Sequence, residues 1–202
     1  MTTSTNNEIL GNRTVLLKNV RTGYLVLYTP QQYLNSGPAR YSAQLLVEKG
    51  SEHDKQIREA IEQISTEVHG AKSAKYLASI QTNGQKYCYQ DGDLKTNESY
   101  QGWWVLGANR REKQGPPLVL DTYNDTATGK LRRIPENEGK VYSGCYVNAK
   151  VNLWVQTDEN PGIRATIEAV QFSKDGDAFT PGAARPSDEG FEELSVESDD
   201  LS

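Results

Sequence analysis

Residues 141–155 (VYSGCYVNAKVNLWV) alternate between two kinds of side chain. One set is mostly small and apolar, which is the pattern of positions that face a core when a chain is extended. The other set should face solvent, yet it is rich in aromatic and basic side chains. This segment therefore predicts a strand with an unusual outer face, which carries Tyr142, Tyr146, Lys150 and Trp154.

Fifteen extended residues would span roughly 50 Å, which is too long to run straight through a small barrel. A bulge near Gly144 or Asn148 would reverse the alternation and turn Trp154 toward the core. We therefore expect Tyr142, Tyr146 and Lys150 to share a face, with Trp154 joining them only if the strand is regular.

Short apolar and β-branched runs recur along the rest of the chain, which favours a mainly β protein. Residues 14–20 and 24–28 predict two strands or one bent strand. The absence of a βαβ rhythm favours a small barrel or sandwich. Further strands are expected at residues 41–48, 86–90, 100–109, 117–121 and 163–172.

One helix is well marked after the strand expected at residues 41–48. Ser51 followed by Asp54 fits a capping box, and Gly70 is placed to end the helix. A shorter helical piece is expected over residues 71–79. The longer helix has an apolar stripe formed by Ile57, Ile61, Ile64 and Val68.

Charge divides the chain unevenly. Of its 27 acidic residues, seven lie in residues 187–202, which contain no Lys or Arg. The remainder holds 22 basic and 20 acidic residues and is slightly positive. The last residues should be a disordered acidic tail joined by a Gly, Pro and Ala-rich linker. We therefore expect a folded domain over residues 1–172, with linker and tail over residues 173–202.

The residues that enzymes use are scarce. Both histidines, His53 and His69, fall in or at the end of the predicted helix, and the two cysteines lack metal-ligand spacing. No phosphate-binding loop or HExxH motif occurs. We expect no catalytic site, no metal and no cofactor. With no secretion signal and no apolar run of about 18 residues, the chain is expected to be a soluble intracellular protein.

Aromatic and basic residues instead interleave along the predicted strands. Aromatic rings stack on bases of any identity, and Lys and Arg follow phosphates, so the combination favours a single-strand binding surface. Each ring taken alone could equally pack in the core or under a loop. The stacking candidates are Tyr87, Tyr89, Tyr100, Trp104, Tyr142, Tyr146 and Trp154. The phosphate candidates are Lys86, Arg110, Arg111, Lys113, Arg132, Arg133 and Lys150.

The acidic tail offers a second kind of surface. It could lie in the protein's own cationic groove when DNA is absent and reach a basic replication partner when DNA displaces it, or it could simply increase solubility. Its apolar anchors would be Phe191, Leu194 and Leu201. The acidic positions are Asp188, Glu189, Glu192, Glu193, Glu197, Asp199 and Asp200.

From Arg40 to Gly176 the order of motifs resembles a family of phage single-stranded DNA-binding proteins typified by that of Enterobacter phage Enc34. The motifs are RYSAQLLVEKG, QIREAIEQISTEVHG, QDGD, YQGWWVLGAN, PPLVLD, VYSGCYVNAKVNLWV and GIRATIEAVQFSKDG.

This resemblance implies an OB-fold-like five-stranded barrel elaborated with one or two helices. It also implies binding of single-stranded DNA without sequence choice in phage replication or recombination, with no catalysis. The expected setting is the cytoplasm of an infected bacterium, as a monomer or small homo-oligomer with no membrane association. Phage DNA polymerase, helicase or primase would be the partners of the tail. The chain ends in Leu201 and Ser202, unlike some T7-like tails that end in an aromatic residue.

Three alternatives remain open. A recombination annealing protein would share the nucleic-acid surface but form rings or filaments. A virion protein would use the β body to bind protein. A metal-dependent nuclease would need Asp91, Asp93 and Asp121 to meet at one site.

Overall fold

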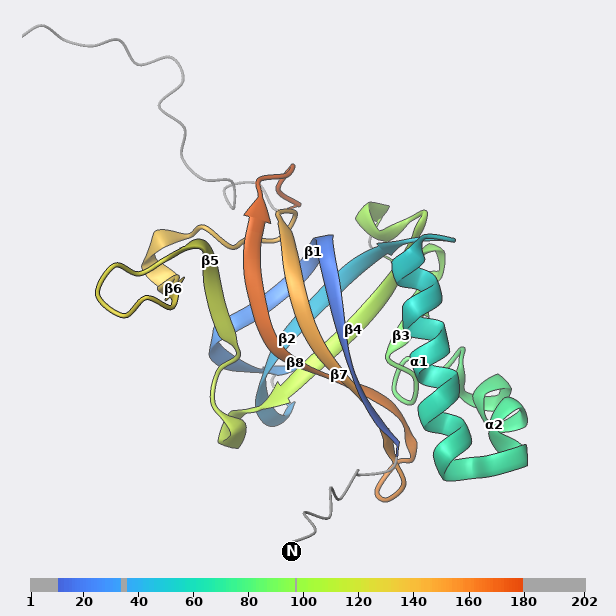
Figure 1. The fold of residues 1–202 in the computed structure, drawn as a ribbon. Coiled ribbons are helices and arrows are strands. Elements are labelled where there is room, and N and C mark those ends of the chain that lie inside the picture. The colour runs from blue at the N-terminus through green and yellow to red at the C-terminus, as the bar shows by residue number, and fades with distance from the viewer. Residues whose placement is uncertain (1–10, 34–35, 97, 180–202) are drawn as a thin grey trace, which may run out of the picture.

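The computed structural model describes residues 11–33, 36–96 and 98–179, which form eight strands and two α-helices (Figure 1). The strands are β1 (Asn12–Tyr33), β2 (Ser36–Glu48), β3 (Tyr89–Asp91), β4 (Trp103–Arg111), β5 (Leu118–Asn124), β6 (Leu131–Arg133), β7 (Tyr146–Gln156) and β8 (Gly162–Lys174). The helices are α1 (Glu52–His69) and α2 (Ser73–Ile80).

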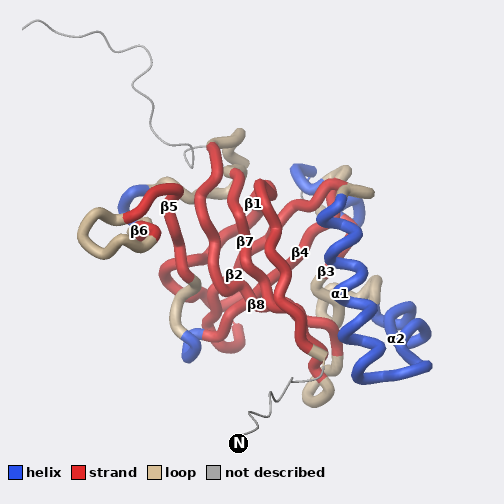
Figure 2. The backbone as a smooth tube through the Cα atoms, in the orientation of Figure 1, coloured by secondary structure: helices blue, strands red, loops and turns tan. Residues whose placement is uncertain are grey.

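These eight strands belong to one sheet, in the order β3-β4-β2-β1-β7-β8-β5-β6. Among them, every pairing is antiparallel except that of β5 with β8. The sheet curls so that β7 and β8 cross β2 and β4, and both helices lie at one side (Figure 2). The prediction of a mainly β fold with one or two helices is confirmed.

The sheet differs from the implied five-stranded barrel, because it has eight described strands and does not close. Residues 86–88 nevertheless connect its two curled sides. The Cys88 amide donates to the Ile163 carbonyl over 3.1 Å, and the Cys88 carbonyl accepts from the Gly107 amide over 2.8 Å. This bridged segment links β8 to β4, between which the described residues form no continuous ladder.

β1 is one bent strand, which decides between the two arrangements that its sequence allowed. Its first part pairs with β7 and its second part with β2. The register with β7 shifts between Leu17 and Val20, where Asn19 has a φ of 52°. This bulge lets one strand serve both sides of the curled sheet.

α1 forms where its capping residues predict it. The Ser51 hydroxyl accepts from the Asp54 amide, while Asp54 Oδ2 accepts from the Gly50 amide over 2.9 Å. Gly70 follows the helix with a φ of 54°. The helix also contributes directly to the core, because its isoleucines are buried against the sheet. Within the described residues, neither helix is long and apolar enough to cross a membrane.

β7 keeps strict alternation, which confirms the core half of the predicted pattern over residues 147–153. Val147, Ala149, Val151 and Leu153 are fully buried. The register shifts next to β7 come from extra residues on β1 and β8, so β7 itself is regular and Trp154 stays on its outer face. The strand starts later than predicted, at Tyr146.

The described chain continues past the expected end of the domain at residue 172. β8 runs to Lys174, and residues 175–179 lie against the turn that precedes β7. We call residues 175–179 the strap. The predicted acidic tail, from Asp188 to Leu201, lies outside the described residues.

Candidate nucleic-acid interface

The outer surface of β2 and β4 carries a row of polar side chains. Because β2 and β4 pair in register, Arg40 lies opposite Arg111 and Ser42 opposite Asn109. The Ser42 hydroxyl and Asn109 Oδ1 are 3.0 Å apart, which shows that their side chains share this face. We call this surface the polar face, defined by Arg40, Ser42, Gln44, Asn109 and Arg111.

The alternate residues of the same strands form core. Tyr41, Ala43 and Leu45 are buried on β2, as are Leu106 and Ala108 on β4. Side chains of successive strand residues point to opposite sides, so burial of this set directs the polar set outward. The alternation therefore builds a solvent-facing surface on top of a dry core.

Positive charge on the polar face is not neutralised by any acidic residue that the structure describes. Arg40 and Arg111 are cross-strand partners, and like charges placed opposite one another are destabilising. Within the described residues, neither guanidinium forms an ion pair, and the exposed Lys113 follows close behind. This arrangement has the electrostatics of a surface that binds an anion.

An aromatic cluster covers one end of the polar face. Tyr100 packs with Leu46 and Val105, and its hydroxyl donates to Gln44. Trp103 is half-buried beside this cluster. The cluster therefore places aromatic rings next to Gln44, at one end of the polar face.

Tyr24 of β1 extends the aromatic surface along the edge of the polar face. Its amide donates to the Tyr100 hydroxyl over 3.2 Å, and its own hydroxyl donates to Gln31 Oε1 over 3.0 Å. Gln31 is the cross-strand partner of Arg40, so the ring reaches toward the cationic end of the face. Because Tyr24 is 50% exposed, a flat ring and unpaired cations occur on one surface.

A second outer surface follows β7 and β8, as the alternation in residues 141–155 predicts. Tyr146, Lys150 and Trp154 lie there, and we call it the β7 face. Lys150 pairs with Glu168 at 3.1 Å, and the Trp154 indole donates to the Thr166 hydroxyl over 3.1 Å. The Lys174 ammonium lies 4.5 Å from the centre of the Tyr146 ring. The Lys150 ammonium and the Trp154 indole N–H therefore already have partners within the protein.

Two of the stacking candidates are corrected, because Tyr87 and Tyr89 are buried in the main core. Tyr100 is also buried, but it lies in the separate cluster at the end of the polar face, in contact with Phe179. The Tyr89 hydroxyl donates to Asp54 Oδ1 over 3.0 Å, and burial raises its pKa. Burial also raises the pKa of Tyr87 to about 12. Tyr87 and Tyr89 belong to the main core, so their rings have no open face on which a base could stack.

Trp104 and Tyr142 are partly buried and engaged in contacts. The Trp104 ring lies 4.3 Å from the Arg58 guanidinium and packs against Tyr89 on the core side. The Tyr142 hydroxyl lies 3.0 Å from Asp175 Oδ1 and 2.9 Å from the Gly176 carbonyl. Both rings join separate segments of the fold.

The predicted phosphate residues divide into engaged and exposed groups. Arg110 donates to the main-chain carbonyls of Gln114 and Gly115, and Lys86 is half-buried. The exposed members that form no ion pair within the described chain are Arg111, Lys113 and Arg133.

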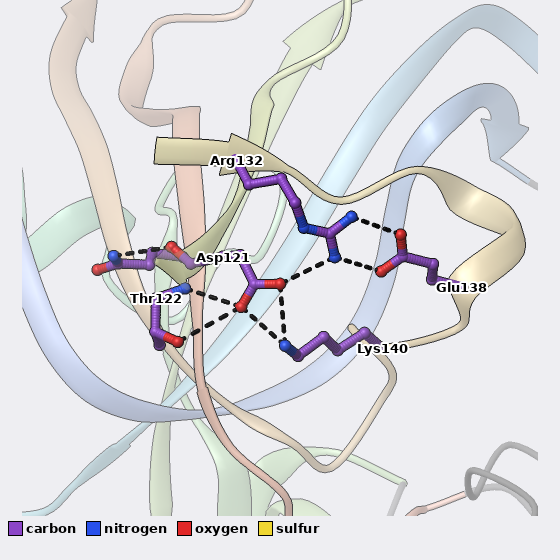
Figure 3. Close-up of polar contacts among 6 residues, drawn as sticks. Asp121, Thr122, Arg132, Glu138 and Lys140 are labelled. Atoms are coloured by element: carbon purple, nitrogen blue, oxygen red, sulfur yellow. Dashed lines mark hydrogen bonds and ion pairs between the residues drawn. The ribbon is translucent and has the colours of Figure 1, made fainter. Parts of the chain in front are cut away.

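Arg132 belongs to an ion-pair network around the buried Asp121 (Figure 3). It binds Glu138 through two 2.6 Å contacts and Asp121 at 3.0 Å, while Lys140 reaches Asp121 at 2.7 Å. Burial alone would raise the pKa of Asp121, but hydrogen bonds from Lys140, the Thr122 amide and Arg132 lower it to about 2. Both terminal nitrogens of Arg132 point at carboxylates, so this arginine would have to leave an ion pair to contact a phosphate, and its predicted phosphate role stays a prediction.

The carboxylates of the nuclease alternative do not meet. Lys49 binds Asp91 and Asp93, each at 2.6 Å, whereas Asp121 lies in the separate network with Lys140. The hydrogen bond to Asp91, followed by that to Asp93, raises the pKa of Lys49. Among the residues that the structure describes, no group of three His, Cys, Asp or Glu could hold a metal ion.

Several residues of the polar face were not among the DNA-binding residues predicted from the sequence. Ser42 and Asn109 occur in strands that were predicted, and Arg40 lies one residue before the predicted start of its strand. Their significance depends on pairing between segments 67 residues apart. Of the two adjacent tryptophans, Trp104 was predicted to stack on bases, whereas Trp103 is the one that lies beside the polar face. A period-two assignment with Leu106 and Ala108 facing inward would have placed Trp103 outside.

Two comparisons of sequence place the chain among phage proteins. A family model described as Enterobacter phage Enc34, ssDNA-binding protein, matches residues 13–201. A protein designated p50 from Acyrthosiphon pisum secondary endosymbiont phage 1 is 33% identical over 184 residues, which cover 90% of this chain and 94% of p50.

Solved structures show the same fold. The single-stranded DNA-binding protein from bacteriophage Enc34, in complex with ssDNA, has a TM-score of 0.64 and 24% identity, covering 83% of this chain and 89% of that one. Another structure of that protein has a TM-score of 0.62 at 24% identity, covering 88% of each chain. The chain belongs to the family of the Enterobacter phage Enc34 single-stranded DNA-binding protein.

Proposed function

We propose that this chain binds single-stranded DNA without sequence specificity in phage DNA replication and recombination. The observation that carries the proposal is the Arg40 and Arg111 pair, which forms no ion pair with any described residue and lies on an outer face that also presents Trp103 and Tyr24. Membership of the family supports it, because the family is described by a protein that binds ssDNA.

The polar face supplies the two interactions that such binding needs. Arg40 and Arg111, with the nearby Lys113, would contact phosphates. Trp103 and Tyr24 would stack on bases of any identity, at about 1 to 3 kcal/mol per base. Because neither interaction reads base edges, binding should be independent of sequence.

The β7 face is the second surface proposed for this role, through Tyr146, Lys150 and Trp154. Its aromatic and basic composition supports it. Its internal pairing makes it the weaker binder, since Lys150 would have to leave Glu168 to reach a phosphate. Substitutions on the two faces separate these alternatives.

We infer a binding role without catalysis. The carboxylates that a nuclease would use are held by Lys49 and Lys140, which supports this inference. The protein would act in the cytoplasm of the infected bacterium, as a monomer or small homo-oligomer.

We propose that the acidic tail competes with DNA and recruits a phage polymerase, helicase or primase. Its negative charge complements the cationic polar face, which supports the competition. Ending the chain at Pro186 should tighten binding to oligo-dT at low salt and abolish capture of the partner. Unchanged or weaker DNA binding by the shortened chain would refute the competition.

The function is tested by fluorescence-anisotropy titration of labelled oligo-dT over a salt series, with a duplex of equal length as control. Tight single-strand binding should weaken with a log–log slope of about −0.7 per phosphate contacted. Absence of oligo-dT binding at low salt, in the full and the shortened chain, would favour a virion role. Strand annealing with ring or filament assembly would identify an annealing protein.

A further inference from the structure

The strap crosses from the end of β8 to the aromatic end of the polar face. The main chain of Gly176 both accepts from and donates to the Tyr142 hydroxyl, and the Phe179 amide donates to the Ser143 carbonyl over 3.1 Å. The backbone of Gly144 lies so close that a Cβ there would collide with the Asp177 carbonyl oxygen. The strap therefore follows a specific path across the turn before β7.

This path delivers the Phe179 ring to a defined slot. The ring centre lies 4.4 Å from the Arg21 guanidinium carbon and 6.4 Å from the Tyr100 ring, which it meets edge-on. Leu46 and Val105 belong to the same cluster. A flat ring held by a guanidinium and an aromatic neighbour has the surroundings of a stacked nucleobase.

Arg21 retains unused binding capacity in this slot. Its Nη2 donates to the Asp177 carbonyl over 3.0 Å, but its buried Nε has no partner in the described part of the chain. A buried donor without an acceptor carries a free-energy cost. Displacement of the strap would free Nη2 as well, which would leave Arg21 with two donors for the acceptor oxygens of a ligand.

The slot is continuous with the polar face. Leu46 continues the row formed by Arg40, Ser42 and Gln44 at alternate positions of β2. Six residues of strand span about 20 Å, which gives room for several nucleotides between the slot and the Arg40 and Arg111 pair. The hydrogen bond from the Tyr100 hydroxyl to Gln44 joins the two directly.

We propose that the Arg21 and Tyr100 slot is a nucleobase subsite at one end of the polar face. Phe179 occupies it when DNA is absent, and an incoming base displaces the strap. This proposal rests on the proposed single-stranded DNA-binding function and adds a specific subsite and its internal competitor.

The first test compares the oligo-dT affinity of the full-length protein with that of Phe179→Ala. Removal of the competitor should tighten binding at least threefold, whereas Phe179→Trp, which keeps a flat ring, should stay within twofold of the unsubstituted protein. Tyr123→Ala removes an exposed ring outside the slot and serves as the matched control. Tyr142→Phe, which releases the strap from the Tyr142 hydroxyl but keeps the ring, should also tighten binding.

A double substitution separates loss of a competitor from general loosening of the strap. Adding Arg21→Ala to Phe179→Ala should abolish the gain in affinity, because the base then has no guanidinium to stack on. Both variants should also be made in the chain ended at Pro186. The ratio of their oligo-dT affinities should be the same there as in the full-length protein, because Phe179 precedes the acidic tail and is retained in both chains. A gain that persists without Arg21 would overturn the subsite.

The last test measures amide hydrogen exchange of the strap with and without saturating oligo-dT. Exchange of the Phe179 amide should become faster on DNA binding, because its bond to Ser143 is lost. Slower or unchanged exchange, or a Phe179→Ala variant with unchanged or weaker affinity, would contradict the proposal. Failure of the unsubstituted protein to bind oligo-dT would instead overturn the proposed function.

Discussion

The polar face and the β7 face have similar side chains but different neighbours. Both present aromatic and basic residues on the outside of regular strands. On the β7 face, Lys150 pairs with Glu168 and the Trp154 indole donates to the Thr166 hydroxyl, so both of these polar groups already have partners. On the polar face, Arg40 lies opposite Arg111. The difference shows that the side chains which the adjacent strand places nearby, more than the residue type, decide whether a charge is available to a ligand.

The largest expected effect comes from removing the unpaired cations. The double variant Arg40→Ala with Arg111→Ala should weaken oligo-dT binding about 100-fold, at about tenfold for each charged contact. The salt slope should become shallower by about 1.4, because two phosphate contacts are lost. Lys150→Ala is the matched control on the β7 face and should change affinity less than about twofold, because its charge is already paired. A larger loss for Lys150→Ala would reverse the ranking of the two faces.

Removing one aromatic ring from each face should give a smaller effect. Trp103→Ala should weaken binding about tenfold, since one stacked base is worth about 1 to 3 kcal/mol. Trp154→Ala should leave affinity nearly unchanged. Anisotropy titrations at one salt concentration measure both, with thermal melts to establish that each variant is folded. Equal losses at the two positions would mean that DNA covers both faces.

The smallest expected effect is a difference in melting temperature between variants of Arg132, which is engaged in ion pairs, and Arg133, which is exposed. Arg132→Ala should lower the melting temperature by a few degrees, because Asp121 and Glu138 lose a partner while Lys140 remains. Arg133→Ala should leave the melting temperature unchanged. Thermal unfolding of both variants under the same conditions makes the comparison. Weaker DNA binding by Arg132→Ala at unchanged stability would instead show that Arg132 contacts a phosphate.

Local sequence signals were sufficient where the determining contacts are close in the chain. Ser51 and Gly70 define the ends of α1 through their own backbone conformation and capping. The alternation from Val147 to Leu153 predicts a strand with one buried side, since the period of a strand is a local property. The same alternation also indicated which side of β7 would be outside.

Aromatic and basic residues could not be assigned locally, because the same side chain suits a core, an ion pair and a binding surface. Tyr89 is buried, and its hydroxyl donates a hydrogen bond to Asp54, which lies 35 residues earlier in the chain. Arg132 is engaged because folding brings Asp121 and Glu138 to it. Neither partner can be identified from strand periodicity.

Local pattern was thus enough to establish a mainly β chain, one capped helix and a regular β7 with an apolar inner side. Which charges remain unpaired was settled only by folding, because it depends on the register between β2 and β4. The place of Phe179 was likewise decided by folding, since its slot is assembled from β1, β2, β4, the turn before β4 that holds Tyr100, and the turn before β7. Periodicity is set between neighbouring residues, whereas partners are set by contacts between segments that are distant in the chain.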